Sequence, residues 1–369
     1  MIIELTLLGA MTISVLGHLY FHLYYYLKLY KYKPSLKDKE FKEGISVIIC
    51  SKNEESNLRK YLPMILNQNY SNYEVIVVND QSEDNTNFLL KDLQKINKNL
   101  EIVNIDSHVR EKKGKKFALT LGIKTAKHKY LLLTDADCEV LSKDWISNMA
   151  QEFLDKDIVL GYSNYLKSEG LLNKVIRYDT FFIAQQYLSF ALKGNTYMGV
   201  GRNLGYKKSL FFDNKGFASH INLASGDDDL FIQAIAKNDN VSICISHQSH
   251  TISECTNKWS VWKNQKRRHL TTSPLYKNKI KFFLAVSSIF QILFWLTLII
   301  LLVVSKGLYV YIVTLVFFRL LTSYIVYYKN MKLLKAMDVY IIHPFYEFVN
   351  LISQVIFVLL NMIKKPNKW

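Results

Sequence analysis

Long apolar runs at both ends of the chain constrain its fold more than any other feature. The first run covers residues 2–27 and the last covers residues 282–363, while the sequence between them has the mixed polarity of a soluble domain. A helix needs about 20 mostly apolar residues to cross the hydrocarbon layer of a bilayer. The pattern therefore predicts a water-soluble domain between two membrane regions.

The predicted parts are an N-terminal transmembrane helix at 1–27, a soluble domain at 28–280 and a C-terminal membrane region at 281–369. The first apolar run ends in three tyrosines followed by Lys28 and Lys31, which is typical of an interfacial belt with a basic flank on the inner side. Glu4 near the start argues against a cleaved signal peptide. We expect the N-terminus outside and residue 28 onward in the cytoplasm.

The C-terminal region holds two strong candidate spans, 282–304 and 308–328, joined by the short turn Ser305-Lys306-Gly307. They are expected to form a hairpin whose turn lies outside. A third stretch at 339–363 is interrupted by His343, Pro344 and Glu347. This stretch is predicted to be either a kinked span or a helix lying partly in the interface.

Lysine and arginine outnumber acidic residues by 47 to 31, which gives a formal net charge of +16. Lysines stand beside the apolar runs at Lys28, Lys31, Lys33, Lys329, Lys332 and Lys335. This placement is typical of contacts with anionic lipid headgroups. The basic residues are scattered otherwise and form no motif of the usual nucleic-acid-binding modules. We therefore expect the membrane as a partner and no nucleic acid.

The four cysteines, at positions 50, 138, 244 and 255, are far apart in the sequence. They form no C-x-x-C pair, so neither a disulfide framework nor a structural zinc site is predicted. A reducing cytosol fits best.

Between the membrane regions, strand-like apolar runs alternate with helical stretches. The predicted strands are 46–50, 74–79, 101–104 and 130–133, and the predicted helices are 57–67, 85–96 and 116–125. This alternation predicts an α/β fold with a parallel sheet covered by helices on both faces. No G-x-x-x-x-G-K-[ST] loop is present, and the glycines at 199–205 lack the spacing of a dinucleotide fingerprint. Both observations argue against P-loop enzymes and dinucleotide oxidoreductases.

Asp135 and Asp137 form a D-x-D sequence just after the predicted strand at 130–133. Ligands of open α/β sheets collect beyond the carboxyl ends of the strands, which is where these side chains fall. Hard divalent cations prefer oxygen ligands and share them with substrate phosphates. The pair is therefore a candidate for holding Mg²⁺ or Mn²⁺ against a diphosphate, whereas a D-x-D taken alone also fits a solvated acidic turn.

Further segments accompany the D-x-D in a fixed order. They are SVIICSKNE at 46–54, VVNDQSEDNT at 77–86, GKKFAL at 114–119, GVGRNL at 199–204, GDDDL at 226–230 and QKRR at 265–268. With these segments, residues 44–269 resemble the family 2 glycosyltransferases of the GT-A fold. The resemblance implies a Rossmann-like nucleotide-sugar-binding domain, a nucleotide-sugar donor and inversion of the transferred sugar.

The same resemblance implies roles for individual residues on the nucleotide side. Asn53 and Glu54 match the Asn-Glu that follows the opening strand. Asp80 would accept a hydrogen bond from the uracil imide, which favours UDP donors, and Lys115 would contact the nucleotide. A turn-capping aspartate and a solvated lysine are the alternative interpretations of Asp80 and Lys115.

The resemblance also assigns the acidic residues. Asp137 would bind the metal directly, and Asp135 would bind the ribose or the metal. One carboxylate of the cluster at 226–229 would be the general base that takes the proton from the acceptor hydroxyl. The family's usual Glu-Asp pair is replaced here by Gly-Asp-Asp-Asp, so counting back from the following leucine selects Asp227, while reading Gly-Asp-Asp selects Asp228. We favour Asp228 slightly, and an acidic helix start is the alternative for the cluster.

Gln265 and Arg268 match a Gln-x-x-Arg motif, in which the planar arginine would clamp the diphosphate. A basic helix beside the membrane is the alternative. Trp259 and Trp262 just before the motif are interpreted as interface anchors. Processive synthases of the family carry Trp after this motif, but His269 stands here and offers a smaller face for stacking a sugar.

The sequence thus predicts an integral membrane enzyme of a bacterial-type inner membrane. It would transfer one or a few sugars from a UDP-sugar to a lipid-linked or membrane-proximal glycan acceptor. The alternatives are a processive polysaccharide synthase, a nucleotidyltransferase, and a non-catalytic membrane transport or lipid-binding protein. The sugar, the acceptor and the oligomeric state stay open.

Overall fold

A computed structural model describes residues 2–33, 39–105, 114–305, 307–364 and 366. The chain forms two compact units, each built from separate segments of the sequence. The helical unit comprises 1–33, 167–193 and 257–365, and the sheet unit comprises 34–166, 194–256 and 366–369. The predicted boundaries at 27/28 and 280/281 stay predictions. By their contacts, 167–193 and 257–280 belong with the apolar helices.

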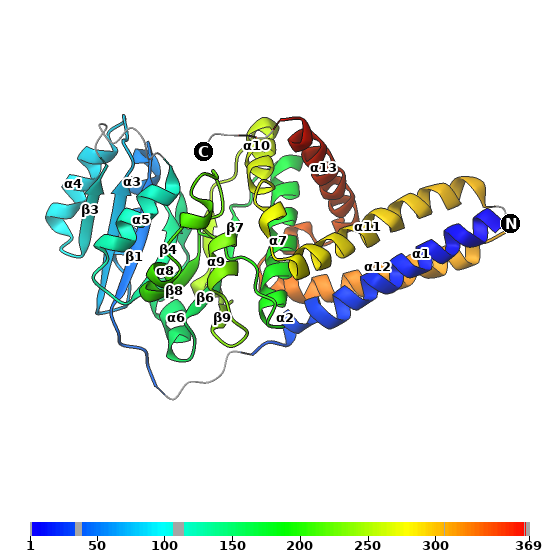
Figure 1. The fold of residues 1–369 in the computed structure, drawn as a ribbon, viewed down its shortest axis with the longest axis horizontal. Coiled ribbons are helices and arrows are strands. Elements are labelled where there is room, and N and C mark those ends of the chain that lie inside the picture. The colour runs from blue at the N-terminus through cyan, green and yellow to red at the C-terminus, as the bar shows by residue number, and fades with distance from the viewer. Residues whose placement is uncertain (1, 34–38, 106–113, 306, 365, 367–369) are drawn as a thin grey trace. The chain divides into compact units, whose positions relative to one another are not determined.

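A mixed sheet of seven strands forms the centre of the sheet unit, as far as the chain is described (Figure 1). Its spatial order is β3-β2-β1-β4-β8-β6-β9. The strands are β1 (Ile45–Ser51), β2 (Tyr73–Asn79), β3 (Leu100–Asn104), β4 (Tyr130–Asp135), β6 (Ile158–Gly161), β8 (Leu204–Lys207) and β9 (Val241–Cys244). β1 to β4 run parallel to one another, as the alternation of strand-like and helical stretches predicts.

The helices of the sheet unit are α3 (Glu55–Leu66), α4 (Thr86–Ile96), α5 (Lys115–Thr125), α6 (Trp145–Gln151), α8 (Lys208–Asp213) and α9 (Asp229–Ile235). α3 shows why they form, because Leu58, Leu62 and Ile65 recur at the spacing of one helix face and lie in the apolar core. β1 is buried along almost its whole length, as central parallel strands are. The strands and helices predicted between residues 46 and 133 are confirmed, with small shifts at their ends.

β8 departs from the predicted parallel sheet. It lies between β4 and β6 and runs antiparallel to both. Its first residue, Leu204, pairs with Leu133 near the carboxyl end of β4. The chain therefore enters β8 at the edge where β4 ends, and it has to run in the opposite direction. This arrangement brings the glycine-rich segment 199–203 to the same edge of the sheet as the D-x-D.

A small second sheet of the sheet unit has the order β5-β10-β7. Its strands are β5 (Cys138–Val140), β7 (Ser163–Tyr165) and β10 (Thr251–Ser253). β5 begins immediately after Asp137, so the turn that carries the D-x-D is held by a strand on each side.

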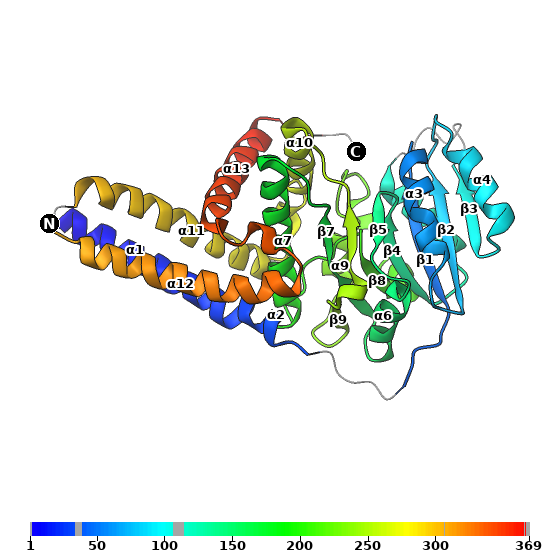
Figure 2. The ribbon, with the colours of Figure 1, turned by 180° about the vertical axis from the view of Figure 1, so that it is seen from behind.

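The helical unit consists mainly of helices, several of them long. They are α1 (Ile2–Tyr20), the π-helical η1 (Phe21–Tyr26), α2 (Leu27–Lys31), α7 (Leu171–Ala191), α10 (Trp259–His269), α11 (Asn278–Val304), α12 (Tyr309–Leu333) and α13 (His343–Ile363). Short 3₁₀ turns, including η6 (Met337–Val339), connect some of them. α1, α11 and α12 lie side by side in both views of the molecule (Figures 1 and 2).

Within the described residues, four helical segments are long and apolar enough to cross a membrane. They are Ile2–Lys31, Asn278–Val304, Tyr309–Leu333 and His343–Ile363. The two strong candidates of the C-terminal hairpin are therefore confirmed as helices of sufficient length and hydropathy. Lys306, the middle residue of the predicted turn between them, lies outside the described residues.

A kinked span was one of the two alternatives predicted for the third C-terminal stretch, and Pro344 does not kink α13. α13 begins at His343, so Pro344 occupies its first turn, where a missing N–H and a fixed φ are tolerated. Glu347 is also compatible with this helix, because its side chain forms a buried ion pair with Arg319 of α12. His18 of α1 meets Ser323 of α12 at 2.9 Å. Polar contacts therefore join α12 to α13 and to α1 among otherwise apolar side chains.

Candidate active site

The predicted acidic residues meet where β1, β2 and β4 end. In register, Ser51 of β1 lies beside Asn79 of β2, and Cys50 lies beside Asp135, the last residue of β4. The chain passes from β1 outward through β2 and β3 and then returns to the other side of β1 as β4. Ligands of open α/β sheets bind at such a switch in strand order. The fold thus places the D-x-D where the sequence predicts a ligand.

Lys115 joins two of the predicted acidic residues. It is the first residue of α5, and its Nζ lies 2.6 Å from Asp135 Oδ1 and 3.7 Å from Asp227 Oδ2. Burial lowers the pKa of Lys115, but Asp135 and Asp227 outweigh this effect and raise the pKa above its ordinary value. The ammonium group is therefore charged at neutral pH and offsets part of the acidic cluster.

A small cavity lies beside this ion pair, and Asp228 reaches it as well. Its lining residues are Ile48, Cys50, Lys115, Leu119, Leu133, Thr134, Asp135, Gly201, Asp227 and Asp228. These residues come from β1, β4, α5, the segment before β8 and the start of α9. Residues from five separate parts of the chain, including both candidates for the base, are brought together at one place.

Asp228 is the N-cap of α9, and its carboxylate accepts two backbone N–H groups. The Gly201 N–H donates to Oδ2 at 3.0 Å, and the Asp229 N–H donates to Oδ1 at 2.9 Å. Burial, together with the carboxylates of Asp227 and Asp229, raises the pKa of Asp228 to about 7. Gly226 precedes the cluster with a φ of +108°, a conformation that glycine adopts readily. The geometry thus gives one carboxyl that titrates near neutral pH.

Asp137 lies in the turn between β4 and β5, partly buried. Burial and the neighbouring Asp135 raise the pKa of Asp137, because two like charges are held close together. A divalent cation bound by both carboxylates would relieve this repulsion.

A metal ion would need further ligands at this pair. Among the described residues, no group of three or more His, Cys, Asp or Glu side chains is placed to hold a metal ion. Mg²⁺ is commonly bound by one or two carboxylates plus substrate phosphates and water. The two carboxylates of Asp135 and Asp137 fit this pattern of ligands.

Asn53 and Glu54 follow β1, and their backbone is tied to the loop after β2. The Asn53 N–H donates to Ser82 Oγ at 2.9 Å, and the Glu83 N–H donates to Asn53 Oδ1 at 2.7 Å. Asn53 has a φ of +56°, which asparagine tolerates better than most residues. Burial raises the pKa of Glu54, with smaller contributions from Asp137 and Asp135. Asn53 thus braces the two loops, and Glu54 lies within electrostatic reach of the D-x-D.

Asp80 comes directly after β2 and is buried, with 3% of its surface exposed. Its backbone N–H donates to Ser51 O at 2.8 Å, which extends the pairing of β1 and β2 by one step. Asp80 also contributes to the raised pKa of Cys50, after burial and other charged neighbours. It therefore belongs to the same strand-end cluster as Lys115 and Asp135.

Gln265 and Arg268 lie on α10 in the helical unit, whereas the other predicted site residues lie in the sheet unit. Trp262 on the same helix was predicted to be an interface anchor, and this prediction is wrong. Only 2% of its surface is exposed, and its ring packs edge-on against Phe357 of α13 at 5.4 Å. Trp259, by contrast, is 47% exposed. The spacing of two tryptophans at i and i+3 did not reveal that one of them faces another helix.

Arg202 is a candidate that the sequence analysis did not single out. Its carbonyl accepts hydrogen bonds from Thr134 at 3.0 Å and from Thr251 at 3.1 Å, and its guanidinium lies over the Tyr165 ring at 4.3 Å. Burial lowers the pKa of Arg202, but Tyr165 and the acidic groups around it, Asp137 among them, raise it overall. In the sequence, the one indication of a functional role for Arg202 is its position in GVGRNL, a segment that resembles the family but was given no role.

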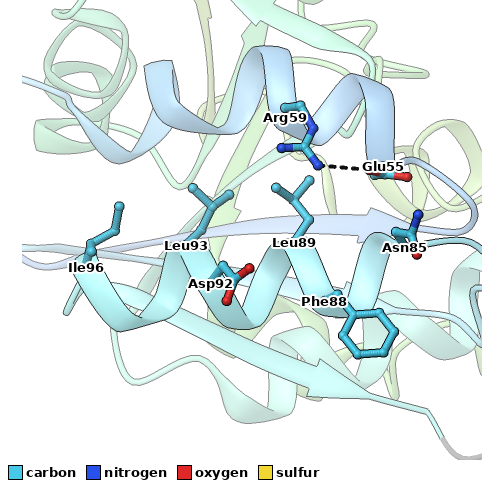
Figure 3. A pocket seen from close by; sticks show the side chains of 8 residues that line it. All are labelled: Glu55, Arg59, Asn85, Phe88, Leu89, Asp92, Leu93 and Ile96. Atoms are coloured by element: carbon cyan, nitrogen blue, oxygen red, sulfur yellow. Dashed lines mark hydrogen bonds and ion pairs between the residues drawn. The ribbon is translucent and has the colours of Figure 1, made fainter.

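A second hollow in the sheet unit lies between α3 and α4 (Figure 3). It is lined by Glu55, Arg59, Asn85, Phe88, Leu89, Asp92, Leu93 and Ile96. Arg59 forms an ion pair with Glu55 across one turn of α3, at 2.9 Å (Figure 3). This hollow contains none of the predicted site residues, and we assign it no role in catalysis.

Comparison with known proteins agrees with the geometry. Residues 46–213 match the sequence profile of Glycosyl transferase family 2. The chain carries a family 2 glycosyltransferase domain. The matched stretch begins in β1 and ends with α8, so it contains Asp80, Lys115, Asp135 and Asp137. It ends before the acidic cluster at 227–229.

Two curated relatives are similar to parts of the chain. An uncharacterized glycosyltransferase of Haemophilus influenzae is 29% identical over 123 residues, which are 33% of this chain and 36% of the relative. A poly-β-1,6-N-acetyl-D-glucosamine synthase of Staphylococcus aureus is 33% identical over 127 residues, which are 33% of this chain and 29% of the relative. The similarity thus spans about a third of the length of these relatives.

A solved structure is similar over nearly the whole chain. It is a mannosyltransferase from Pyrobaculum calidifontis in complex with GDP-Man and Mn²⁺, with a TM-score of 0.56 and 16% sequence identity. The alignment covers 92% of this chain and 99% of that chain. At this identity the likeness shows the fold, and the glycosyltransferase domain has a mixed α/β sheet of the GT-A type.

Proposed function

We propose that this glycosyltransferase transfers a sugar from a UDP-sugar to a lipid-linked or membrane-proximal glycan acceptor, with inversion at the anomeric carbon. The observation that carries the proposal is the meeting of Lys115, Asp135, Asp227 and Asp228 around one small cavity at the carboxyl ends of β1 and β4. Acidic groups and a charged lysine at a strand-order switch suit a nucleotide diphosphate and a reacting hydroxyl better than they suit a structural core.

Asp135 and Asp137 are proposed to hold Mg²⁺ or Mn²⁺ together with the donor diphosphate. The raised pKa of Asp137, caused by burial and by the neighbouring Asp135, supports a cation at this pair. The structural neighbour contains Mn²⁺ and GDP-Man. When bound, such an ion stabilises the negative charge of the leaving nucleoside diphosphate.

Each predicted binding residue is proposed to have one role toward a nucleotide-sugar donor. Asp80 would bind the base, Lys115 the nucleotide and Asp135 the ribose, with Asn53 and Glu54 shaping the loops at the strand ends. Gln265 and Arg268 of α10 would bind a diphosphate, for which the planar guanidinium is well suited. These roles rest on the family resemblance and on the residue chemistry described above.

Asp228 is proposed as the general base, with Asp227 as the alternative. It takes the proton of the acceptor hydroxyl while that oxygen forms a bond to the anomeric carbon and the bond from this carbon to the diphosphate oxygen breaks. A base that titrates near the working pH is suited to this step. The pKa of Asp228, raised by burial to about 7, supports the assignment.

The enzyme is proposed to lie in a bacterial-type inner membrane with its catalytic domain in the cytoplasm, where nucleotide sugars are made. The candidate spans and the lysines beside them support this orientation. In a cysteine-free background, a cysteine at Gly307 should be labelled from outside by a membrane-impermeant reagent, and one at Lys329 should be protected in intact cells. The reverse pattern would contradict the orientation.

Processive polysaccharide synthesis is the second candidate, and the Staphylococcus aureus relative is named a polysaccharide synthase. His269 in place of the aromatic residue of processive synthases favours transfer of one or a few sugars. The test is to supply the preferred UDP-sugar to membranes containing this protein and to measure the mass of the product. A short glycolipid of fixed mass would support limited transfer, and a long homopolymer would establish the synthase instead.

The central experiment is a screen of nucleotide sugars for release of the nucleoside diphosphate by the purified protein, with and without EDTA. We expect release from a UDP-sugar that stops with EDTA and returns with added Mg²⁺ or Mn²⁺. Release that EDTA does not affect would contradict the metal assignment. Release from another nucleotide sugar alone would contradict the role given to Asp80.

A further inference from the structure

The two middle residues of the segment Gln265-Lys266-Arg267-Arg268 are tied to other helices of the helical unit. Lys266 Nζ lies 2.8 Å from Asp179 Oδ2 on α7. Their side chains are 13% and 5% exposed, so the pair is largely removed from water. A buried ion pair with good geometry holds its helices more firmly than a surface pair does, because leaving either charge alone is costly.

Arg267 binds the end of α13. Its Nε donates to Asn361 Oδ1 at 2.9 Å, and its Nη2 donates to the carbonyls of Leu360, at 3.1 Å, and of Lys364. Asn361 returns the contact, because its Nδ2 donates to the carbonyl of Arg267 at 2.8 Å. The Leu360 carbonyl also accepts the backbone N–H of Lys364 at 3.0 Å, so Arg267 is a second donor to it. A cation at the carboxyl end of a helix is favoured by the helix dipole. Arg267 thus binds the carboxyl end of α13.

Trp262 adds an apolar contact to the same pair of helices. It lies about one turn before Lys266 and packs against Phe357, which lies one turn before Asn361. The buried indole and the Arg267 contacts therefore fix α10 against α13 at two successive levels. Together with the Asp179 contact to α7, they restrain both the position of α10 and its rotation about its own axis.

Helix geometry shows what this restraint controls. Residues three apart share a face, so Gln265 and Arg268 lie together on one side of α10. Each residue advances about 100° around the helix, so Lys266 and Arg267 point away from that side. We propose that Lys266 and Arg267 are positioning residues, which anchor the back of α10 so that Gln265 and Arg268 are held on a common face of this helix for the diphosphate binding proposed for them.

This inference rests on the proposed function, because Gln265 and Arg268 are given their role there. It adds that Lys266 and Arg267, which lie between them, affect donor binding indirectly, by fixing the position of α10. Productive binding requires groups placed closely, and a displacement of about 1 Å can cost about a hundredfold in rate. Loss of an anchor should therefore weaken donor use without removing any group that touches the donor.

The test compares variants on both sides of each anchor. Lys266→Gln and Arg267→Gln should each raise the donor KM about tenfold, with a smaller change in kcat. Asp179→Asn and Asn361→Ala, which change only the anchoring partners, should raise it similarly. The double variant Lys266→Gln/Asp179→Asn should be no worse than either single variant. Lys266→Arg and Arg267→Lys should regain most of the loss.

Lys263→Gln is the matched control, since it makes the same charge change on the same helix and should leave the donor KM unchanged. Folding is checked by size-exclusion chromatography and Tm in detergent. If Asp179→Asn does not fold, the comparison of Arg267→Gln with Asn361→Ala makes the same test on the other anchor.

The outcomes separate this inference from the proposed function. If Arg268→Gln raises the donor KM but Asp179→Asn and Asn361→Ala do not, Lys266 and Arg267 are not positioning residues. If Lys266→Gln is harmful while Asp179→Asn is harmless, Lys266 itself contacts the donor, and the inference is overturned. If neither Gln265→Ala nor Arg268→Gln changes the donor KM, the proposed diphosphate clamp fails.

Discussion

The two units use charged residues in opposite ways. At the strand ends of the sheet unit, the side chains of Lys115, Asp135 and Asp227 keep 21%, 29% and 11% of their surface exposed. In the helical unit, the Arg319 and Glu347 side chains keep only 1% and 3%. Charged side chains that are partly exposed can contact a ligand, whereas fully buried ones contact only the neighbouring helices. The difference teaches that charge alone does not mark a site, because a charged pair that is closed off from solvent cannot contact a ligand.

The strongest test of this comparison removes one partner of the buried pair. Arg319→Gln or Glu347→Gln should destabilise the protein by about 3–5 kcal/mol, because each leaves a charge buried without its partner. The double variant Arg319→Met/Glu347→Leu should regain most of this loss. Unfolding in detergent, followed by tryptophan fluorescence, measures the effect.

An exposed ion pair of the sheet unit is the control for that test. Lys95 and Asp92 lie 2.8 Å apart with side chains 73% and 72% exposed. Lys95→Gln should change the free energy of unfolding far less, because exposed ion pairs contribute little to stability. Equal losses at the two pairs would mean that burial does not separate the two uses of charge.

At the strand ends, Asp137→Asn should reduce transfer by at least about a hundredfold while leaving Tm unchanged, because it removes one ligand charge beside the developing diphosphate charge. Rates at several Mn²⁺ concentrations measure the effect, and the surface variant Asp239→Asn is the control. Full activity in Asp137→Asn would remove this residue from the site.

The variants Asp227→Asn and Asp228→Asn separate the two candidates for the base. Loss of the true base should lower kcat by about a hundredfold or more, with little change in donor affinity. Single-turnover rates and donor binding are the measurements. If neither variant slows transfer, the base lies outside this cluster.

The pH dependence gives a finer test. Burial, with Asp227 and Asp229, raises the pKa of Asp228 to about 7, and a base works only when deprotonated. The value of kcat/KM should therefore fall about tenfold per unit as pH drops below 7 and level off above it. The residual activity of Asp228→Asn should not show this fall in kcat/KM below pH 7. A wild-type profile that is flat from pH 5 to pH 8 would contradict the assignment.

The smallest expected effect concerns stability at the same residue. A carboxyl whose pKa is raised in the folded state favours folding when protonated, and this contribution is lost as pH rises through its folded pKa, here about 7. Asp228→Asn should therefore raise Tm slightly at pH 8 and less at pH 5. An equal or larger increase at pH 5 would argue against a raised pKa.

Sequence reasoning predicted the sheet unit better than the helical unit, for a physical reason. Strand and helix periods between residues 46 and 133 are local signals, and so is an acidic pair after an apolar run. The direction of β8, the buried position of Trp262 and the contacts of Lys266 and Arg267 depend on segments far away in the chain. The first turn of α13 also escaped prediction, because a proline signals a kink or a helix start equally well.

The same difference between local signals and long-range contacts applies to the candidate site. Asp135 and Asp137 were predicted because the carboxyl end of a strand is visible in the sequence, and Asp227 and Asp228 were predicted from the resemblance to family 2 glycosyltransferases. The roles of these residues stay predictions. The meeting of Lys115 with Asp135 and Asp227 required the fold, since these residues are far apart in the chain. Arg202 had only its position in the segment GVGRNL as a sequence signal, because its place is set by Thr134, Thr251 and Tyr165.

The membership of α7 in the helical unit has a consequence for how the protein is made. α7 lies between β7 and β8 in the sequence, yet Arg177 and Asp179 on it pair with Asp338 and Lys266, which are synthesised later. At about 5–20 residues per second, Lys266 follows the last residue of α7 by roughly 4–15 s and Asp338 follows it by roughly 7–30 s. During that interval the charges of α7 have no partners from those segments. α7 is therefore synthesised before the C-terminal segments that provide the partners of its ion pairs.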